Sequence, residues 1–151
     1  MSEQMTDSFI WEGKKWIFLG ADNIYSLFDP QKFGLSPTPP HTACWKGFIV
    51  QFRTFENQLI LDQLHVHCDN RIYPKINGIK PRFGGFQMKV YNNLNMKLSY
   101  TGTIIVGKGM LPEFRGRAFT GPHSYATTYE LTFREGTLVN SRETSGSYSG
   151  F

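Results

Sequence analysis

The chain has 151 residues and a formal net charge of +4, with 40% hydrophobic and 15% aromatic residues, a composition that fits one folded domain and excludes disordered and fibrous proteins. Its 15 glycines and 8 prolines make it rich in turns, which argues against a helical bundle. No apolar run reaches the roughly 18 residues of a membrane-spanning helix, and the first residues lack a signal-peptide pattern, so we expect a cytoplasmic protein without membrane association.

The first expected elements are one short strand and one helical turn. Residues 15–19 are mostly apolar and lie between Gly13 and Gly20, which favours a strand. Asp22 can then cap a helical turn that places apolar side chains on one side. Residues 30–42 follow as a connector with four prolines, too many for a central strand.

Four segments in the middle of the chain alternate between apolar and polar residues, the pattern of strands with one buried face: residues 45–53, 58–68, 86–91 and 94–101. Asn92-Asn93 separates the last two segments, so we predict a hairpin there. Its second strand should run on to Val106 with a bend at Gly102. In that strand, side chains that should be buried alternate with side chains that should be exposed, the buried set being Leu94, Met96, Leu98 and Tyr100 and the exposed set Lys97 and Ser99.

The last third of the chain begins with a second connector rich in glycine and proline, residues 107–124. Residues 125–133 and 137–142 then alternate as strands around a turn at Glu135-Gly136. Seven or so strands joined by turns predict an all-β fold, either a single antiparallel curved sheet or a closed β-barrel that is lipocalin-like in outline, with a sandwich as the alternative. We expect one domain over residues 1–144 and a mobile tail over residues 145–151.

The positive charge is concentrated in one part of the sequence. Residues 71–117 contain nine basic residues and one acidic residue, Glu113, a net charge of +8, whereas the rest of the chain carries −4. Such a field attracts anionic partners, although an ordinary solvated surface explains the same residues. The anion-binding candidates are carried by the predicted hairpin and by the second connector: Lys89, Lys97, Lys108, Arg115 and Arg117.

Three of these candidates lie in the runs Gly107-Lys108-Gly109 and Arg115-Gly116-Arg117. Backbone amides of a glycine-rich loop can cradle a phosphate when basic side chains support them. The spacing matches neither the P-loop nor the dinucleotide-binding pattern, so an ordinary flexible loop is the competing interpretation.

Two histidines lie two residues apart in a predicted strand. His65 and His67 project to the same face, as a pair of Zn²⁺ ligands requires, and His41 and Cys44 upstream would supply a third and a fourth ligand if their segment pairs alongside. The alternative is that all three histidines are surface or hydrogen-bonded side chains. Cys68 points away from His67, which argues against a cysteine–histidine catalytic pair. Two cysteines give no disulfide framework, so we expect a reduced setting.

Residues 42–48, Thr-Ala-Cys-Trp-Lys-Gly-Phe, resemble a motif of small uncharacterised bacterial β-rich proteins. Residues 100–102 and 129–131, Tyr-Thr-Gly and Tyr-Glu-Leu, are similar to two further strand patterns of these proteins. The resemblance implies a bacterial origin but no activity. From the residues themselves we expect a core anchor, in which Trp45 packs, Gly47 allows a close approach and Cys44 fills a small space.

These features favour a non-enzymatic binding module whose basic surface recognises an anionic macromolecule, either nucleic acid or an acidic protein such as a toxin or effector. One alternative is a β-barrel that holds a small molecule at its mouth. The other is a metal-dependent enzyme built on the three histidines, and Zn²⁺ is then the only cofactor considered. The first hypothesis requires the basic residues between positions 71 and 117 to form one continuous surface.

Overall fold

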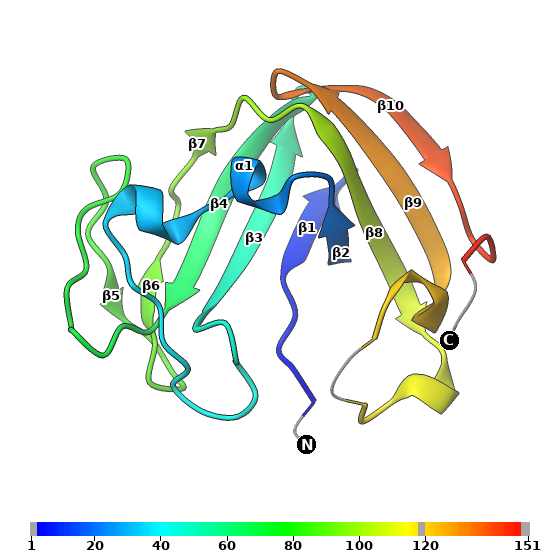
Figure 1. Cartoon of the computed structure of the whole chain (residues 1–151). Helices are drawn as coiled ribbons and strands as arrows, with labels where there is room; N and C mark the ends of the chain where they lie inside the picture. The colour runs from blue at the N-terminus through cyan, green and yellow to red at the C-terminus, as the bar shows by residue number, and fades with distance from the viewer. Residues whose placement is uncertain (1–2, 118–119, 149–151) are drawn as a thin grey trace.

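The computed structural model describes residues 3–117 and 120–148, which form one extended β-sheet with short helical segments in its connections (Figure 1). The strands are β1 (Ser8–Trp11), β2 (Lys14–Ala21), β3 (Phe48–Phe55), β4 (Gln58–Val66), β5 (Arg82–Phe83), β6 (Lys89–Tyr91), β7 (Met96–Lys97), β8 (Gly102–Met110), β9 (Tyr125–Arg134) and β10 (Thr137–Glu143). The helical segments are α1 (Ile24–Leu27) and the 3₁₀ turns η1 (Pro30–Phe33), η2 (Pro112–Phe114) and η3 (Pro122–Ser124). Among the residues described, no helix has the length and apolar character to cross a membrane.

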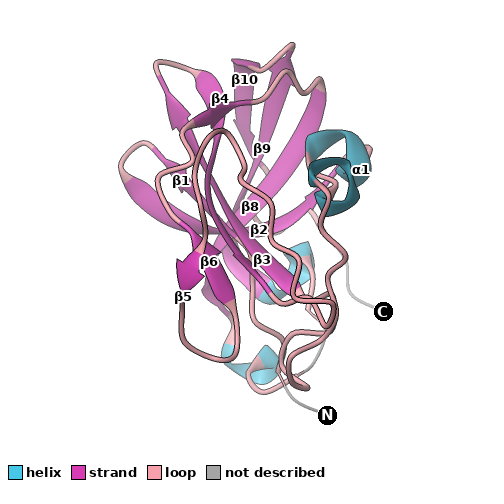
Figure 2. Ribbon diagram, turned by 90° about the vertical axis from the view of Figure 1, so that its left-hand side faces the viewer, coloured by secondary structure: helices cyan, strands magenta, loops and turns pink. Residues whose placement is uncertain are grey.

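The two ends of the sheet are joined by hydrogen bonds. The strand order is β10-β9-β8-β2-β1-β3-β4-β6-β5, and β10 also pairs with β4 where Thr137 faces Gln58. A hydrogen-bonded ring therefore runs through β4, β3, β1, β2, β8, β9 and β10. In this ring β1 and β3 run parallel, and the other neighbours run antiparallel. Figures 1 and 2 show the strong curvature of the sheet, and the expected all-β fold built on one curved sheet is confirmed, although the parallel pair β1–β3 makes the sheet mixed where we expected it to be antiparallel throughout.

β1 is a strand that the sequence pattern did not reveal. It lies between β2 and β3, and Ser8, Phe9 and Trp11 are all buried, so the alternation of a half-exposed strand is lost. Glu12 and Gly13, with φ of 52° and 72°, form the two-residue turn from β1 into β2. Two positive φ values in succession match the twist of a tight hairpin, and this turn sets the register of both strands.

The hairpin predicted around Asn92-Asn93 does not form. β6 and β7 instead both pair antiparallel with β4, β6 with residues 64–66 and β7 with residues 60–61. Between them, Leu94 N donates to Asp62 O at 2.9 Å, which keeps the chain beside β4. Asn93 and Asn95 have φ of 52° and 47°, so asparagine's tolerance of positive φ serves two kinks instead of a reversal. β4 thus supplies the hydrogen bonds that the hairpin would have supplied.

The predicted faces of residues 94–100 are confirmed, although their partner strand differs. Leu94 and Tyr100 are buried, and the two apolar residues between them are half-buried. Lys97 and Ser99 are exposed. The alternation of apolar and polar residues shows which face of the segment is turned toward the core. It does not depend on which strand pairs with the segment.

Aromatic rings from distant parts of the sequence fill the core. The ring centre of Phe9 on β1 lies 6.2 Å from that of Phe52 on β3 and 6.3 Å from that of Phe133 on β9. Trp11 and Trp16 pack against each other with ring centres 5.5 Å apart, and Tyr129 joins them from β9. Burial of one such side chain contributes about 2–3 kcal/mol to stability. These aromatic contacts therefore hold together strands on opposite sides of the hydrogen-bonded ring of strands.

The closure of the ring depends on Gly136, in the turn that joins β9 to β10. Gly136 N donates to Tyr100 O at 2.8 Å, and Gly136 O accepts from Leu59 N at 2.8 Å, so the turn is held between β4 and the chain before β8. The φ of Gly136 is 84°, and a Cβ there would overlap the carbonyl oxygen of Leu98. The predicted turn at Glu135-Gly136 is confirmed, and its second position requires glycine.

The last described residues continue along β9. Thr128 N donates to Ser145 Oγ at 3.1 Å, and Tyr148 OH donates to Glu130 Oε2 at 2.8 Å. Residues 149–151, the end of the tail that we expected to be mobile, lie outside the described residues.

We predict that Gly136→Ala destabilises the protein far more than Gly13→Ala. Both glycines have positive φ, but a Cβ at Gly13 meets nothing within 4 Å, so Gly13→Ala carries only the backbone cost of about 1 kcal/mol. Gly136→Ala adds the overlap with Leu98 and should cost about 3 kcal/mol or more. Urea unfolding of the two variants and the wild type measures both free energies. Equal losses would show that ring closure does not depend on the space at Gly136.

Candidate functional site

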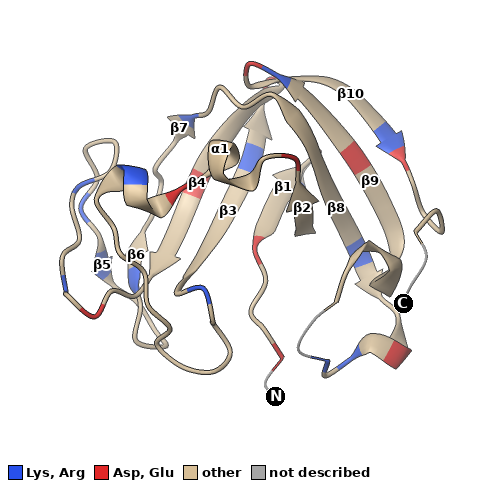
Figure 3. Cartoon of the chain, in the orientation of Figure 1, with Lys and Arg blue, Asp and Glu red and all other residues tan. Residues whose placement is uncertain are grey.

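The structure separates the five anion-binding candidates into two groups (Figure 3). Lys89 on β6 and Lys97 on β7 lie beside β4, on one side of the curved sheet. Lys108 on β8, with Arg115 and Arg117 in the connector after it, lies on the other side. The five residues therefore do not form the one continuous positive surface expected over residues 71–117, because the chain crosses the sheet between β7 and the end of β8.

Three of these cations contact aromatic rings, in different surroundings. Lys108 Nζ lies 4.6 Å from the ring centre of the buried Trp16, and Lys108 is itself half-buried. The guanidinium of Arg117 lies 4.9 Å from the ring centre of Phe114. Lys89 Nζ lies 5.9 Å from the ring centre of Phe83, which is exposed. Lys108 thus packs against a buried side chain, whereas Lys89 lies beside a solvent-exposed aromatic ring.

The three histidines do not come together as metal ligands. In residues 3–117 and 120–148, no three His, Cys, Asp or Glu side chains group as they would around a metal ion. His67 follows the end of β4, where its Nδ1 contacts Gln87 O at 3.0 Å and its Nε2 contacts Asp69 Oδ1 at 3.1 Å. His41 Nδ1 accepts from Ala43 N at 3.3 Å. His67 and His41 therefore hold loops in place.

The two cysteines are free, buried thiols. Burial raises the pKa of Cys44 and of Cys68 above the usual value, which opposes formation of a nucleophilic thiolate. Around Cys44 the expected core anchor is confirmed in part. Gly47 has φ of 82°, and a Cβ there would lie 2.7 Å from the backbone of Thr38, so the close approach is real. Trp45, however, is 43% exposed and is not a core residue.

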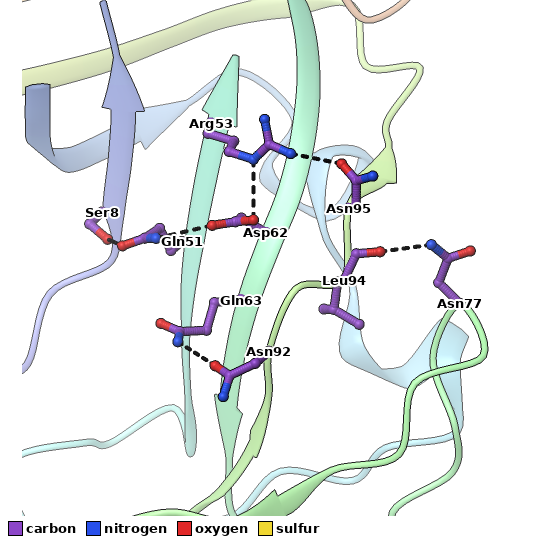
Figure 4. A network of polar contacts seen from close by, with 9 residues as sticks. All are labelled: Ser8, Gln51, Arg53, Asp62, Gln63, Asn77, Asn92, Leu94 and Asn95. Atoms are coloured by element: carbon purple, nitrogen blue, oxygen red, sulfur yellow. Dashed lines mark hydrogen bonds and ion pairs between the residues drawn. The ribbon is translucent and has the colours of Figure 1, made fainter. Parts of the chain in front are cut away.

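A polar network covers the outer side of β1, β3 and β4 (Figure 4). Ser8 Oγ donates to Gln51 Oε1 at 3.0 Å, and Gln51 Nε2 donates to Asp62 Oδ2 at 3.2 Å. Arg53 Nε donates to the other oxygen of Asp62 at 3.2 Å, and its terminal nitrogen donates to Asn95 Oδ1 at 2.7 Å. These groups satisfy one another across neighbouring strands. The network therefore supports the sheet and leaves no free charge for a ligand.

A pocket of about 620 Å³ opens between α1, η1 and the strands β2 and β3. Four phenylalanines, Phe18, Phe28, Phe48 and Phe52, line it together with Leu27 and Val50. They come from three separated parts of the chain, and the walls closest to solvent are Ile24 and Tyr25, which are 43% and 72% exposed. The pocket is thus apolar inside and bordered by exposed apolar side chains.

The wall formed by α1 is held in place from β8. Tyr100 OH donates to Asp22 O, and Thr103 N donates to Asp22 Oδ2 at 3.1 Å. Burial, with the nearby Asp22 carboxylate, raises the pKa of Tyr100 to about 12, so this hydroxyl stays a donor at neutral pH. Asn23, with φ of 49°, then turns the chain into α1. Phe28, just after α1, packs against Phe48 on β3 with ring centres 5.7 Å apart.

Four polar residues lie at the border of the pocket: Asp7, Asp29, Gln31 and Lys46. Asp7 Oδ1 accepts from Val50 N at 2.9 Å, and its other oxygen pairs with Lys46. Asp29 Oδ1 accepts from Gln31 N at 3.0 Å and so caps η1. The Asp7 side chain is 10% exposed and that of Lys46 is 45% exposed, and Lys46 Nζ also lies 4.8 Å from the ring centre of Phe48.

Comparisons of this chain with protein-family models, curated proteins and solved structures found no match. The site is therefore defined by its geometry. A partial signal for it is present in the sequence, because the helical turn predicted after Asp22 places apolar side chains on one side, and these are Ile24, Leu27 and Phe28. Nothing in the sequence indicated that this turn would lie over Phe18 and Phe52 of the sheet.

We predict that protonation of His65 destabilises the protein. His65 lies on β4 opposite Ile49 and Val90, and burial lowers its pKa below the usual value of about 6.5. Below that pH the unfolded chain binds more protons than the folded chain, so stability falls as the pH falls.

Urea unfolding should show a smaller loss of stability between about pH 7.5 and pH 5.5 for His65→Gln than for the wild type. An imidazole titration by NMR with a midpoint above the usual value for His65 would contradict this prediction.

Proposed function

We propose that the protein binds a small apolar molecule in the pocket between α1, β2 and β3. The observation that carries this proposal is an open, preformed pocket of about 620 Å³ lined by four phenylalanines. Ligand pockets in proteins fall in the range of about 300–1,000 Å³ and are mostly apolar with a few fixed polar groups. The volume and the lining of this pocket both agree with that description.

The exposed residues at the border support entry of a ligand. Ile24 and Tyr25 lie on α1, which has four residues and no side-chain hydrogen bond at its N-terminus. A helix this short gains little stability from its own hydrogen bonds, so α1 is held by its surroundings, with Leu27 buried in the core and Ile24 and Tyr25 left exposed. A bound ligand would cover both exposed side chains, which favours the bound state.

The charges at the border suggest the chemical class of the ligand. Asp7 and Asp29 supply two carboxylates, and Lys46 supplies one ammonium group. Aromatic rings inside the pocket also attract cations through their faces. We therefore propose a neutral or cationic apolar molecule, such as an aliphatic or aromatic amine. The free thiols of Cys44 and Cys68 agree with the expected cytoplasmic setting.

A fluorescent apolar probe, N-phenyl-1-naphthylamine, tests the pocket. We predict saturable binding of one equivalent by the wild type and binding weaker by about fivefold or more in the double variant Ile24→Ala, Tyr25→Ala, because two apolar contacts are lost. Both residues are exposed, so the fold should be retained.

Phe83→Ala is the matched control, because Phe83 is an exposed aromatic residue outside the pocket. It should leave the affinity for the probe unchanged. Loss of probe affinity in Phe83→Ala, or full affinity in the double variant, would place the probe elsewhere and contradict the proposal.

Competition with two ligands of equal chain length tests the proposed class. Decylamine should displace the probe at lower concentration than decanoate, because the border carries more negative than positive groups. Lys46→Met should increase this preference, since it leaves the Asp7 carboxylate to the ligand. Stronger displacement by decanoate would reverse the assigned class while leaving the pocket itself supported by the probe.

A further inference from the structure

The end of the sheet formed by β5 and β6 combines exposed aromatic rings with positive charge. Between positions 70 and 89 the sequence has five basic residues and no acidic residue. Among the residues described, Phe83 and Phe86 are the two most exposed large apolar side chains, at 81% and 75%. We define the β5–β6 surface by five residues of this hairpin and the chain entering it: Lys80, Arg82, Phe83, Phe86 and Lys89. Figure 3 shows the basic residues grouped around β5 and β6.

The backbone holds Phe86 in an unfavourable conformation at the tip of the hairpin. Phe86 and Gln87 have φ of 58° and 64°, a region that bulky residues rarely occupy. Gly84 approaches Val90 so closely that a Cβ would overlap that side chain, and Gln87 O is bound by His67. The turn is therefore held by His67, which follows β4, and by β6, while Phe86 is 75% exposed with its ring centre 6.4 Å from that of His41. Neither burial nor backbone preference explains a phenylalanine here, which favours a role in contacting a partner.

Phe83 and Lys89 are directly opposite each other on β5 and β6, with Lys89 Nζ 5.9 Å from the ring centre of Phe83. A solvent-exposed aromatic ring and an ammonium group thus lie side by side on one face of this strand pair. This is the arrangement needed to stack an unpaired base and to contact a phosphate of the same strand. A duplex covers its base faces by stacking, and a membrane would require the Lys89 ammonium to follow the Phe83 ring toward the acyl chains.

We propose that the β5–β6 surface binds single-stranded nucleic acid, with bases stacked on Phe83 and Phe86 and phosphates contacted by Lys80, Arg82 and Lys89. Arg71 and Lys75 add to the positive field in the preceding loop. The surface shares no residue with the pocket beside α1, so an experiment that contradicts one proposal leaves the other unaffected.

Fluorescence anisotropy with a labelled oligothymidylate of about 12 nucleotides tests the proposal. The affinity of the wild type should fall steeply as NaCl rises from about 50 to 200 mM, because phosphate contacts release counterions. Lys89→Gln should weaken binding and reduce the slope of log affinity against log salt by about 0.7. Phe83→Ala should weaken binding by about fivefold or more, and Phe83→Trp should retain it.

Tyr25→Ala is the matched control, an exposed aromatic residue at the pocket that should leave oligonucleotide affinity unchanged. Phe86→Gly should raise the urea midpoint, because glycine accepts positive φ, and yet weaken binding. Tighter binding of the matching duplex, binding only to vesicles containing phosphatidylserine, or wild-type affinity in both Phe83→Ala and Phe86→Gly would overturn the proposal.

Discussion

The two hydrogen bonds of the Gly136 backbone hold the β9–β10 turn between β4 and the chain that leads into β8. Through its amide the β9–β10 turn binds Tyr100, and through its carbonyl it binds β4 at Leu59. Together with the bond from Leu138 N to Asn57 O at 2.7 Å, this contact pairs β10 with β4 and closes the ring of seven strands. Because the ring of strands closes at this one turn, a substitution that adds a Cβ at Gly136 weakens the closure of the whole ring.

Tyr100 connects the turn that closes the ring of strands with the wall of the pocket. Its carbonyl oxygen accepts from Gly136, while its hydroxyl donates to the backbone of Asp22, one residue before the turn into α1. Gly102 makes room for this side chain, since a Cβ there would overlap the Tyr100 hydroxyl. The position of the α1 wall is therefore tied to the closed state of the ring, whereas the β5–β6 surface is attached to the ring through the pairing of β6 with β4.

The sequence predicted the long strands because apolar and polar residues alternate along them, but in β4 a bulge shifts the pairing, so that Gln51 faces Gln63 and Phe52 faces Leu61, and Leu59, Ile60 and Leu61 are all buried. It did not predict β1, whose three buried side chains erase the alternation, or the joint pairing of β6 and β7 with β4, which depends on a competing partner far away in the chain. The charge excess over residues 71–117 was real as a count. The nine residues do not form one surface, because β8 carries Lys108 and the residues after it to the far side of the sheet, while basic residues earlier in the chain group around β5 and β6.

The parallel pairing of β1 with β3 follows from the number of strands in the ring. Neighbours can alternate in direction all the way around a closed ring only when their number is even, and this ring has seven. At least one parallel pair is therefore unavoidable, and here it is β1 with β3. Because β1 lies between β2 and β3, the chain that leaves β2 has to pass over β1 before it reaches β3. Residues 22–47 make this connection, and they carry α1 and η1, which cover the pocket.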